Sequence, residues 1–305
     1  MAVSKLSTGQ LVTGIPGPAK FEDPLTGNIF SGTFTDASSI TWKYWIFKSN
    51  SSIKCIEPGF ADILVVGGGG TSAQFGYNGG GGAGGVLNLQ NVFFDFGDQK
   101  VVIGEGAPRN NVSGAMGPGQ PSIIGPYIAM GGGSSTGRYT SATPSTYGGG
   151  SGAGGCSSDG AVQAPTAGTT GQGNIGGIGL ASYGGGGGGG AGAAGSAATS
   201  AGSGTGGNGG IGIVSTIITT AIATSASVGQ VVGASAVYFG GGGGGGGAGV
   251  QGTGGLGGGG NASASSSADA TPFTGGGAGS CGYSAGNSLS TGSGGCGVVI
   301  LRVRI

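Results

Sequence analysis

Chemistry in this chain would have to come from a few scattered acidic side chains. Paired carboxylates can cleave glycosidic bonds, but Asp95 and Asp98 flank a predicted turn and Glu105 lies in the turn-like "IGEG". The chain has no histidine, so a serine or cysteine nucleophile would lack its usual base. We therefore predict no catalytic residues and a protein that is not an enzyme. The acids weighed for this role are Asp95, Asp98, Glu105, Asp159 and Asp269.

A second chemical motif is the glycine spacing in "ILVVGGGGTSA". Gly68, Gly70 and Ala73 have the G-x-G-x-x-A spacing of a dinucleotide fingerprint, and Asp95 follows at about the expected distance. That fingerprint requires a helix after the glycines, because the pyrophosphate binds at the helix N-terminus. The next residues, "TSAQFGYNGGGGAGG", cannot form one, and no Gly-Lys-Ser/Thr loop is present. We expect no cofactor and no cofactor-binding residues.

The four cysteines are Cys55, Cys156, Cys281 and Cys296, and none belongs to a C-x-x-C pair. Without histidine, a zinc site would need all four thiolates from distant segments. We predict no metal site and buried free thiols that act as small apolar residues. A zinc site and a Cys281–Cys296 disulfide remain as alternatives.

Composition excludes several classes of partner. The 305 residues include 85 glycines, 7% are charged, and the net charge is zero. Between Asn110 and Leu301 the ionisable residues of the Asp, Glu, Lys and Arg types are only Arg138, Asp159 and Asp269, so no basic patch is available for nucleic acid. No apolar stretch approaches the roughly 20 residues that span a bilayer, and "MAVSKLSTGQ" lacks the apolar core of a secretory signal. We expect a soluble chain without membrane insertion.

Apolar residues make up 36% of the chain, which favours folding over a flexible Gly/Ser polymer. We predict strands within three ranges, 41–66, 86–104 and 297–305. The first range contains a polar turn at Ser49 to Ser52. The second contains a hairpin turn at Gly97 and Asp98. The terminal "CGVVILRVRI" places Val299, Leu301, Val303 and Ile305 on one face, while Arg302 and Arg304 share the other face with Val298 and Ile300. A strand this apolar needs a partner, for which "ADILVVGG" and "KYWIFKS" are the candidates. The β-branched "GIVSTIITTAIATSASVGQVV" also favours strands, so essentially no α-helix is expected.

Runs of glycine recur along the chain, and the longest are Gly184–Gly190 and Gly240–Gly247. An extended three-fold helix of the polyproline II type has a rise of about 3.1 Å per residue and no internal hydrogen bonds. Without side chains, such helices can pack laterally and bond to one another. Gly184, Gly190, Gly240 and Gly247 are therefore predicted to delimit structural rods. The predicted fold is mostly β, a β-sandwich-like base with a bundle of extended polyglycine II-type helices.

Aromatic side chains stand beside the glycine runs or inside the variable loops. Their simplest interpretation is that they cap the rods and shield the bundle, and the alternative is that some contact a sugar or a protein. The segment "STGRYTSATPSTYGGG" is the best candidate for such a contact. We predict Arg138, Tyr139 and Tyr147 as a receptor-binding loop.

The ordered set "KYWIFKSNSSIKCIEPGFADILVVGGGG", "KVVIGEGAP", "SIIGPYIAMGGG", "VYFGGGGGGGGAG" and "GSGGCGVVILRVRI" resembles the glycine-rich domain of bacteriophage tail fibres and other virion surface proteins. The resemblance covers about residues 41–305. The chain is also similar to glycine-rich phage adhesins, in which bundled glycine helices carry receptor-contacting loops. It implies a non-enzymatic virion appendage protein, a tail fibre, tail tip or adhesin that attaches to the host.

The resemblance also implies partners. Residues 1–40 would attach the chain to other virion proteins. The chain would form a homo-oligomer, and the usual symmetry of fibres would make it a trimer. The loops would contact a host surface glycan or outer-membrane protein. Two alternatives stay open. One is a structural filament, matrix or decoration protein without receptor binding, and the other is an ice-binding bundle, which the irregular loops disfavour.

Overall fold

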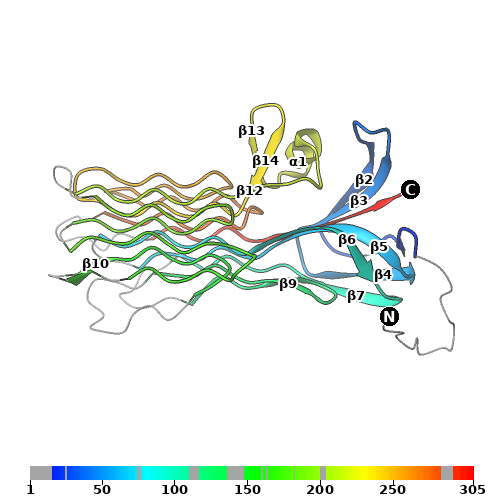
Figure 1. Cartoon of the computed structure of the whole chain (residues 1–305), viewed down its shortest axis with the longest axis horizontal. Coiled ribbons are helices and arrows are strands. Elements are labelled where there is room, and N and C mark those ends of the chain that lie inside the picture. Colours follow the sequence, from blue (N-terminus) through cyan, green and yellow to red (C-terminus); the bar gives the residue numbers. More distant parts are fainter. Residues whose placement is uncertain are drawn as a thin grey trace.

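The computed structural model describes residues 16–24, 26–73, 77–109, 117–135, 148–158, 161–162, 164–181, 183–199, 204–282 and 291–305. The molecule is elongated, with antiparallel sheets at one end and extended glycine-rich segments at the other (Figure 1). The expectation of a mostly β protein is confirmed at this level.

The first sheet has five antiparallel strands in the order β2-β3-β15-β5-β6. Its central strand is β15, the last element of the chain, which pairs with β3 on one side and β5 on the other. Both partners overlap the segments that the sequence named as candidates, "KYWIFKS" and "ADILVVGG". The strands are β2 (Ile29–Thr35), β3 (Thr41–Phe47), β5 (Gly59–Val66), β6 (Val86–Phe94) and β15 (Val298–Arg304).

The second sheet, β1-β4-β7-β8-β9, packs on one face of the first. One buried cluster joins them, with Trp45, Ile63 and Leu301 from the first sheet against Ile53 and Ile124 from the second. Residues 16–24 and 26–40 also belong to this region, since β1 and β2 are strands of the two sheets. The second sheet consists of β1 (Lys20–Phe21), β4 (Ser51–Glu57), β7 (Gly97–Val102), β8 (Ser122–Ile124) and β9 (Tyr127–Ala129).

The predicted hairpin at Gly97 and Asp98 is wrong. Strand β6 pairs with β5 in the first sheet, whereas β7 pairs with β4 and β8 in the second. The chain therefore crosses between sheets at Asp95 and Phe96. Alternation of apolar residues correctly indicated both strands, but Phe94 is buried in the cluster shared by both sheets, and this packing separates the strands.

A small module covers the other face of the first sheet and corrects the prediction for "GIVSTIITTAIATSASVGQVV". Helix α1 (Thr220–Ala226) lies where a strand was expected. The Thr219 side chain caps the first turn by accepting from the Ile222 backbone N–H, and Ser227 ends the helix in the left-handed conformation. Ile222, Ala223 and Ala226 are buried against the face of β15 that carries Ile300, so caps and packing outweigh β propensity. The module's strands are β12 (Ile213–Val214), β13 (Gln230–Val232) and β14 (Ala236–Phe239).

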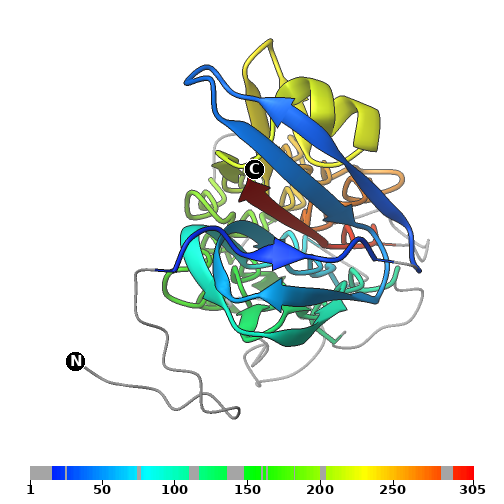
Figure 2. The same ribbon diagram turned by 90° about the vertical axis from the view of Figure 1, so that its right-hand side faces the viewer.

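Figure 2 looks along the molecule from the sheet end and shows the helix on one side of the central strands and the second sheet on the other. Each face of β15 is thereby covered. Val299 and Leu301 face the second sheet, and Val298 and Ile300 face the module. All four are completely buried, so the terminal strand is the centre of the whole base.

The glycine-rich segments continue directly from the strands. β5, β7, β9 and β14 end where segments leave for the far end, and β6, β8, β12 and β15 begin where segments return. We call these segments the glycine bundle. They lie within residues 67–73, 77–85, 103–109, 117–121, 130–135, 148–156, 164–180, 184–199, 204–212, 240–263, 268–282 and 291–297, and the longer ranges contain more than one segment.

Backbone hydrogen bonds in the bundle follow a three-residue period. Along Gly241–Gly246, the amides of Gly242 and Gly245 donate to one neighbouring segment, at Gly210 and Gly207. The amides of Gly243 and Gly246 donate to a second segment, at Gly81 and Asn78. Those of Gly241 and Gly244 donate to a third, at Gly257 and Gly260. Every amide is therefore satisfied by another segment rather than within its own.

The carbonyls of the same run accept from three further segments. The carbonyls of Gly243 and Gly246 accept from the amides of residues 188 and 185. Those of Gly242 and Gly245 accept from residues 255 and 252. Those of Gly241 and Gly244 accept from residues 277 and 280. The run thus lies among six neighbours. This arrangement accounts for the eight consecutive glycines: a Cβ added at Gly243 would overlap the Ala278 carbonyl, so a side chain there would force the segments apart.

Outer segments show the same period in their side chains. In 205–212, "TGGNGGIG", Asn208 and Ile211 are exposed while Gly207 and Gly210 are buried. In 250–257, "VQGTGGLG", the exposed positions are Val250, Thr253 and Leu256. A side chain is accepted at every third position, where the segment faces solvent, and glycine occupies the positions that face neighbouring backbone.

The first prediction concerns this close packing. We expect Gly243→Ala to lower the free energy of unfolding by about 3 kcal/mol, since the methyl group meets backbone that cannot move independently. Gly117→Ala is the matched control, because a Cβ there meets nothing within 4 Å, and it should change stability by no more than about 0.5 kcal/mol. Thermal and denaturant unfolding of both variants measures the difference. Equal stability of the two variants would contradict the packing described above.

Candidate functional site

The distal end of the bundle lies farthest from the sheets, and segments that have left the sheets turn back there. A two-stranded ribbon lies there, β10 (Ser157–Ser158) paired with β11 (Ala161–Val162) (Figure 1). Tyr77 and Tyr183 begin two returning segments and meet edge to face, with ring centroids 5.4 Å apart. Tyr183 is 52% exposed, whereas Tyr77 is 7% exposed.

Tyr183 also has a backbone φ of 76°, which is rare for a bulky residue. Such a conformation persists only where the surroundings impose it, and it is enriched at binding sites. Tyr183 directly precedes the run Gly184–Gly190, and Gly184 forms bridges with Leu180 and Gly247. The distal end therefore presents an aromatic ring on a backbone that is held by the bundle.

The predicted receptor-binding residues Arg138, Tyr139 and Tyr147 fall within 136–147 and lie outside the described residues. Other aromatics next to glycines are distributed between the two ends. The Tyr127 hydroxyl donates to the Phe93 carbonyl in the sheet region, 3.1 Å away, and Phe273 packs against the cluster that contains α1. Proximity to a glycine run in the sequence thus does not assign an aromatic residue to the distal end.

The predicted ends of the two longest glycine runs differ from their middles. Gly190 donates to Ala193 in a reversal, and Gly240 joins the run to β14 with a φ of 73°. The Gly247 amide donates to the side chain of Gln251 at 3.1 Å. These residues form the turns and junctions of the bundle, while the residues between them bond to neighbouring segments.

The candidate acids serve local structure. The Asp95 carboxylate accepts from the Phe96 amide at 2.8 Å, Asp98 lies in β7 opposite Lys54, and Asp159 is outside the described residues. Asp269 pairs with Arg109 at 2.6 Å, which joins two bundle segments. Within the described ranges, no group of three or more acidic or cysteine side chains is placed to hold a metal ion.

The electrostatics of Asp269 are set by opposing effects. Burial favours the neutral acid, but hydrogen bonds from Ser293 and Arg109 favour the carboxylate, and together they hold the pKa of Asp269 below its usual value. Ser293 donates through its backbone N–H at 2.7 Å. The carboxylate therefore ties together three segments, which contain Arg109, Asp269 and Ser293.

None of the four cysteines forms a disulfide, and Cys55, Cys156 and Cys281 are buried. This agrees with the interpretation of the cysteines as buried free thiols and contradicts the Cys281–Cys296 alternative. Burial raises the pKa values of the Cys55 and Cys296 thiols, so both thiols are held in the neutral, unreactive form.

Sequence reasoning overlooked one buried ion pair. Asp62 in β5 and Arg302 in β15 lie opposite each other, with Arg302 Nε 2.9 Å from Asp62 Oδ2. Their side chains are only 6% and 10% exposed. Arg302 also donates to the Ile217 carbonyl and lies over the Trp42 ring, 4.0 Å from its centroid. The available signal was the acid in "FADILVV" and the first arginine in "VVILRVR", two charges of opposite sign in apolar strands that were already candidates to pair.

One side of the bundle carries a regular array of exposed apolar side chains. Four segments lie side by side there, linked by bonds such as Gly195 N–H to Ile175 O, Ser196 N–H to Asn208 O and Gly209 N–H to Thr253 O. The segments 172–180, 192–199, 205–212 and 250–257 contain no Asp, Glu, Lys or Arg. We call this array the surface ladder; it comprises Ile175, Ile178, Ala194, Ala197, Ile211 and Leu256.

Residues 49–304 match the family model of the glycine-rich domain. The chain belongs to the glycine-rich domain family. No curated protein and no solved structure was found to match it. Among the described residues of this family member, no helix is long and apolar enough to cross a membrane.

The second prediction concerns the pH dependence of stability. Because the folded-state pKa of Asp269 lies below the unfolded value of about 3.9, its contribution is present above pH 4 and is lost as the pH falls through the folded pKa. We expect Asp269→Asn to lower the free energy of unfolding at pH 7 by no more than about 1 kcal/mol, since both partners are nearly half exposed and screened.

Unfolding midpoints of the wild type and the Asp269→Asn variant, measured from pH 7 to pH 2, test this. The difference between the two proteins should disappear at pH 2, where the acid is protonated. A difference that persists there would mean that the carboxylate charge is not what stabilises the contact.

Proposed function

We propose that this chain is a non-enzymatic structural protein of a phage virion appendage, a tail fibre, tail tip or adhesin, with a host receptor-binding role. The observation that carries the proposal is that the two ends of the molecule differ. Residues 16–24 and the C-terminal strand belong to the sheets at one end, while the β10–β11 ribbon lies at the other. A protein anchored through its sheet end would therefore display its loops outward, as the resemblance to phage fibre proteins implies.

At the level of the fold, we infer that the bundle segments are polyglycine II-type helices on a sandwich-like base. Three observations support this inference: the period of three in amide direction, the period of three in exposed side chains, and the six neighbours around Gly241–Gly246. A three-fold extended helix gives all three. The base is supported as a sandwich by the cluster that both sheets bury.

The third prediction follows from these helices. Amides of Gly241–Gly246 should exchange with solvent far more slowly than those of a free chain, because each donates to another segment inside the bundle. Hydrogen exchange followed by NMR measures this residue by residue. Exchange at free-chain rates along the whole run would eliminate the helices, and Gly233, in the exposed turn between β13 and β14, serves as the fast reference.

The proposed partners follow from the same difference between the sheet end and the distal end. Residues 1–40 would bind other virion proteins, and the distal loops would bind a host surface glycan or outer-membrane protein. For the receptor contact we retain Arg138, Tyr139 and Tyr147 and add Tyr183, whose ring is exposed at the distal end. No cofactor, nucleic acid or membrane insertion is required.

Self-association is supported by the surface ladder. Exposed apolar side chains on an uncharged face are typical of a contact with another protein, and copies of the chain on a fibre would provide one. We propose a homo-oligomer, with three-fold symmetry taken from the resemblance.

The fourth prediction tests receptor binding on particles that carry the chain. Antibody against residues 130–300 should label fibre or tail tips and block adsorption. The triple variant Arg138→Ala, Tyr139→Ala, Tyr147→Ala should adsorb about tenfold more slowly, which corresponds to the loss of a binding hot spot. Lys100→Ala in the sheet region is the control and should adsorb normally.

Labelling along a shaft or shell with unchanged adsorption would instead favour a structural filament, matrix or decoration protein. The surface ladder is the observation that favours this second candidate, because its regular apolar face could stack chains without any receptor. Deleting residues 1–40 tests the anchoring step, and it also removes β1 and β2 from the two sheets. Continued incorporation of the shortened chain into particles would refute attachment through that segment.

A further inference from the structure

The first sheet splits at the end opposite the bundle. β15 pairs with β5 only from Val298 to Arg302, whose partner is Asp62, but continues alongside β3 as far as Arg304. Beyond the split, the flank of β5 is occupied by residues 17–19. The Phe60 amide donates to Gly17 O at 3.0 Å, and the Ala19 amide donates to Phe60 O at 2.9 Å. β15 and β5 therefore diverge into a fork.

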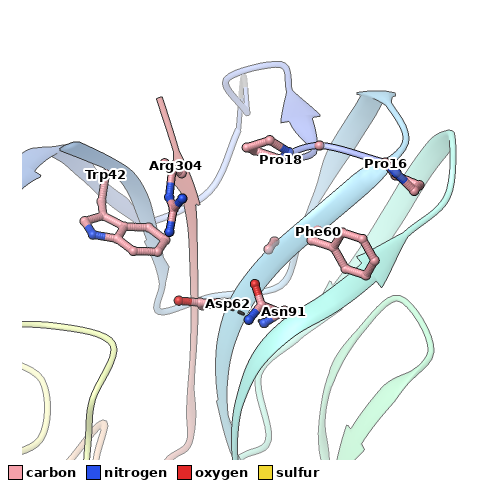
Figure 3. Close-up of a pocket in the computed structure, with 9 residues that line it drawn as sticks. Pro16, Pro18, Trp42, Phe60, Asp62, Asn91 and Arg304 are labelled. Carbon is pink, nitrogen blue, oxygen red and sulfur yellow. Dashed lines mark hydrogen bonds between the residues drawn. The ribbon is translucent and has the colours of Figure 1, made fainter. Parts of the chain in front are cut away.

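A hollow of about 190 Å³ lies in this fork (Figure 3). Trp42 and Arg304 form one wall, Pro16, Pro18 and Phe60 form the other, and Asp62 and Asn91 lie between them. This volume is below the range of about 300 to 1,000 Å³ that is typical of sites for whole small molecules. The hollow therefore suits one side chain and a short length of backbone.

The charge in the fork that has no ion-pair partner among the described residues is positive. Asp62 is already engaged by Arg302 and by the Asn91 backbone amide, 3.0 Å from its Oδ1. Arg304 is exposed, its guanidinium lies 5.7 Å from the centroid of the Trp42 ring, and within the described chain no carboxylate forms an ion pair with it. A guanidinium beside an apolar wall favours a planar anion such as a carboxylate.

Backbone groups also face the fork. The Ile305 amide donates to Thr41 O in β3, at 3.0 Å. Because successive amides in a strand point to opposite sides, the amide and carbonyl of Arg304 point away from β3, toward the gap that β5 has left. The last residues of β15 therefore offer an unpaired strand edge next to a cationic side chain.

We propose that the fork binds an extended segment of a partner protein that carries an aspartate or glutamate. The segment adds to the edge of β15 through the Arg304 backbone, its carboxylate pairs with the Arg304 guanidinium, and its flanking residues rest against Trp42 and the prolines. Addition of a strand to an exposed edge is a common mode of peptide recognition. This inference does not depend on the function proposed above.

The chain's own first fifteen residues fit this site less well. They are "MAVSKLSTGQLVTGI", which contains Lys5 and no acid, so they add positive charge to a positive fork. An acidic segment of another chain has the complementary charge.

The fifth prediction uses NMR titration of the full chain with two blocked peptides, Ac-TVDVT-NH₂ and Ac-TVNVT-NH₂. The chain has two tryptophans, and Trp45, 1% exposed in the core between the sheets, provides an internal reference. The aspartate peptide should shift the Trp42 indole and Arg304 amide signals saturably and leave Trp45 unchanged. The asparagine peptide should bind about tenfold more weakly, since it lacks the charge.

Two variants make the test specific. Arg304→Gln should weaken binding of the aspartate peptide about tenfold, while Arg304→Lys should retain part of it, because a lysine keeps the charge without the planar fork of donors. Lys100→Gln, which removes an exposed cation from the second sheet, is the control and should bind like the wild type.

Other outcomes overturn the proposal. Equal binding by the wild type and Arg304→Gln, or no saturable shift, would exclude the site. If acetate binds as tightly as the peptide, the fork binds a carboxylate but strand addition is excluded. Trp42 shifts that grow with protein concentration, without peptide, would assign the fork to a second copy. Shifts caused by deleting residues 1–15 would assign it to the chain's own end.

Discussion

The structure depends on hydrogen bonds between glycine backbones that no side chain separates. Each amide along Gly241–Gly246 bonds to a different segment from its two neighbours, so no segment is stable without the others. A conventional core stabilises a fold by burying apolar surface. Here the interior of the bundle is backbone, and ordering it costs more conformational entropy per residue than in other proteins. Satisfying every amide and carbonyl in a close-packed array offsets that cost, which makes the bundle cooperative.

The sheet end supplies what the bundle lacks. The two core clusters bury the large side chains, and β15 contributes to both. Since β5, β15 and their neighbours run straight into bundle segments, the sheets fix where those segments start and how they are spaced. An apolar base thus positions a polar backbone array that has almost no side chains with which to position itself.

Charge is used sparingly and in defined places. The Asp62–Arg302 pair is buried between the first sheet and the module, and Arg109–Asp269 joins segments of the bundle. Breaking a buried pair leaves an uncompensated charge, so the first pair also fixes the register of β15 against β5. The described surfaces between these pairs carry few charges, so aromatic rings, hydroxyls and apolar side chains make up most of what they present to other molecules.

Much of this architecture could be predicted from the sequence. Apolar patterning indicated β3, β5 and β15, and it named β3 and β5 as candidate partners of β15, because a strand this apolar needs a partner. Glycine runs indicated segments that pack without side chains. Local pattern also misled: α1 was expected as strand, and β6 and β7 as a hairpin. In both cases burial against a distant element outweighed local preference, as for Ile222 and Phe94.

The candidate sites depended more on the tertiary structure. Sequence identified aromatics near glycine runs but could not separate Tyr183, at the distal end, from Tyr127, in the base. Nor could it reveal the fork, because that site exists only where β15 and β5 diverge and residues 17–19 take the vacated flank. The sequence determined which residues can tolerate close backbone contact and which must be buried, since glycine spacing and apolar alternation are local properties. Only the tertiary structure decided which segments meet, because those contacts join residues that are distant in the sequence, such as Gly69 and Gly295.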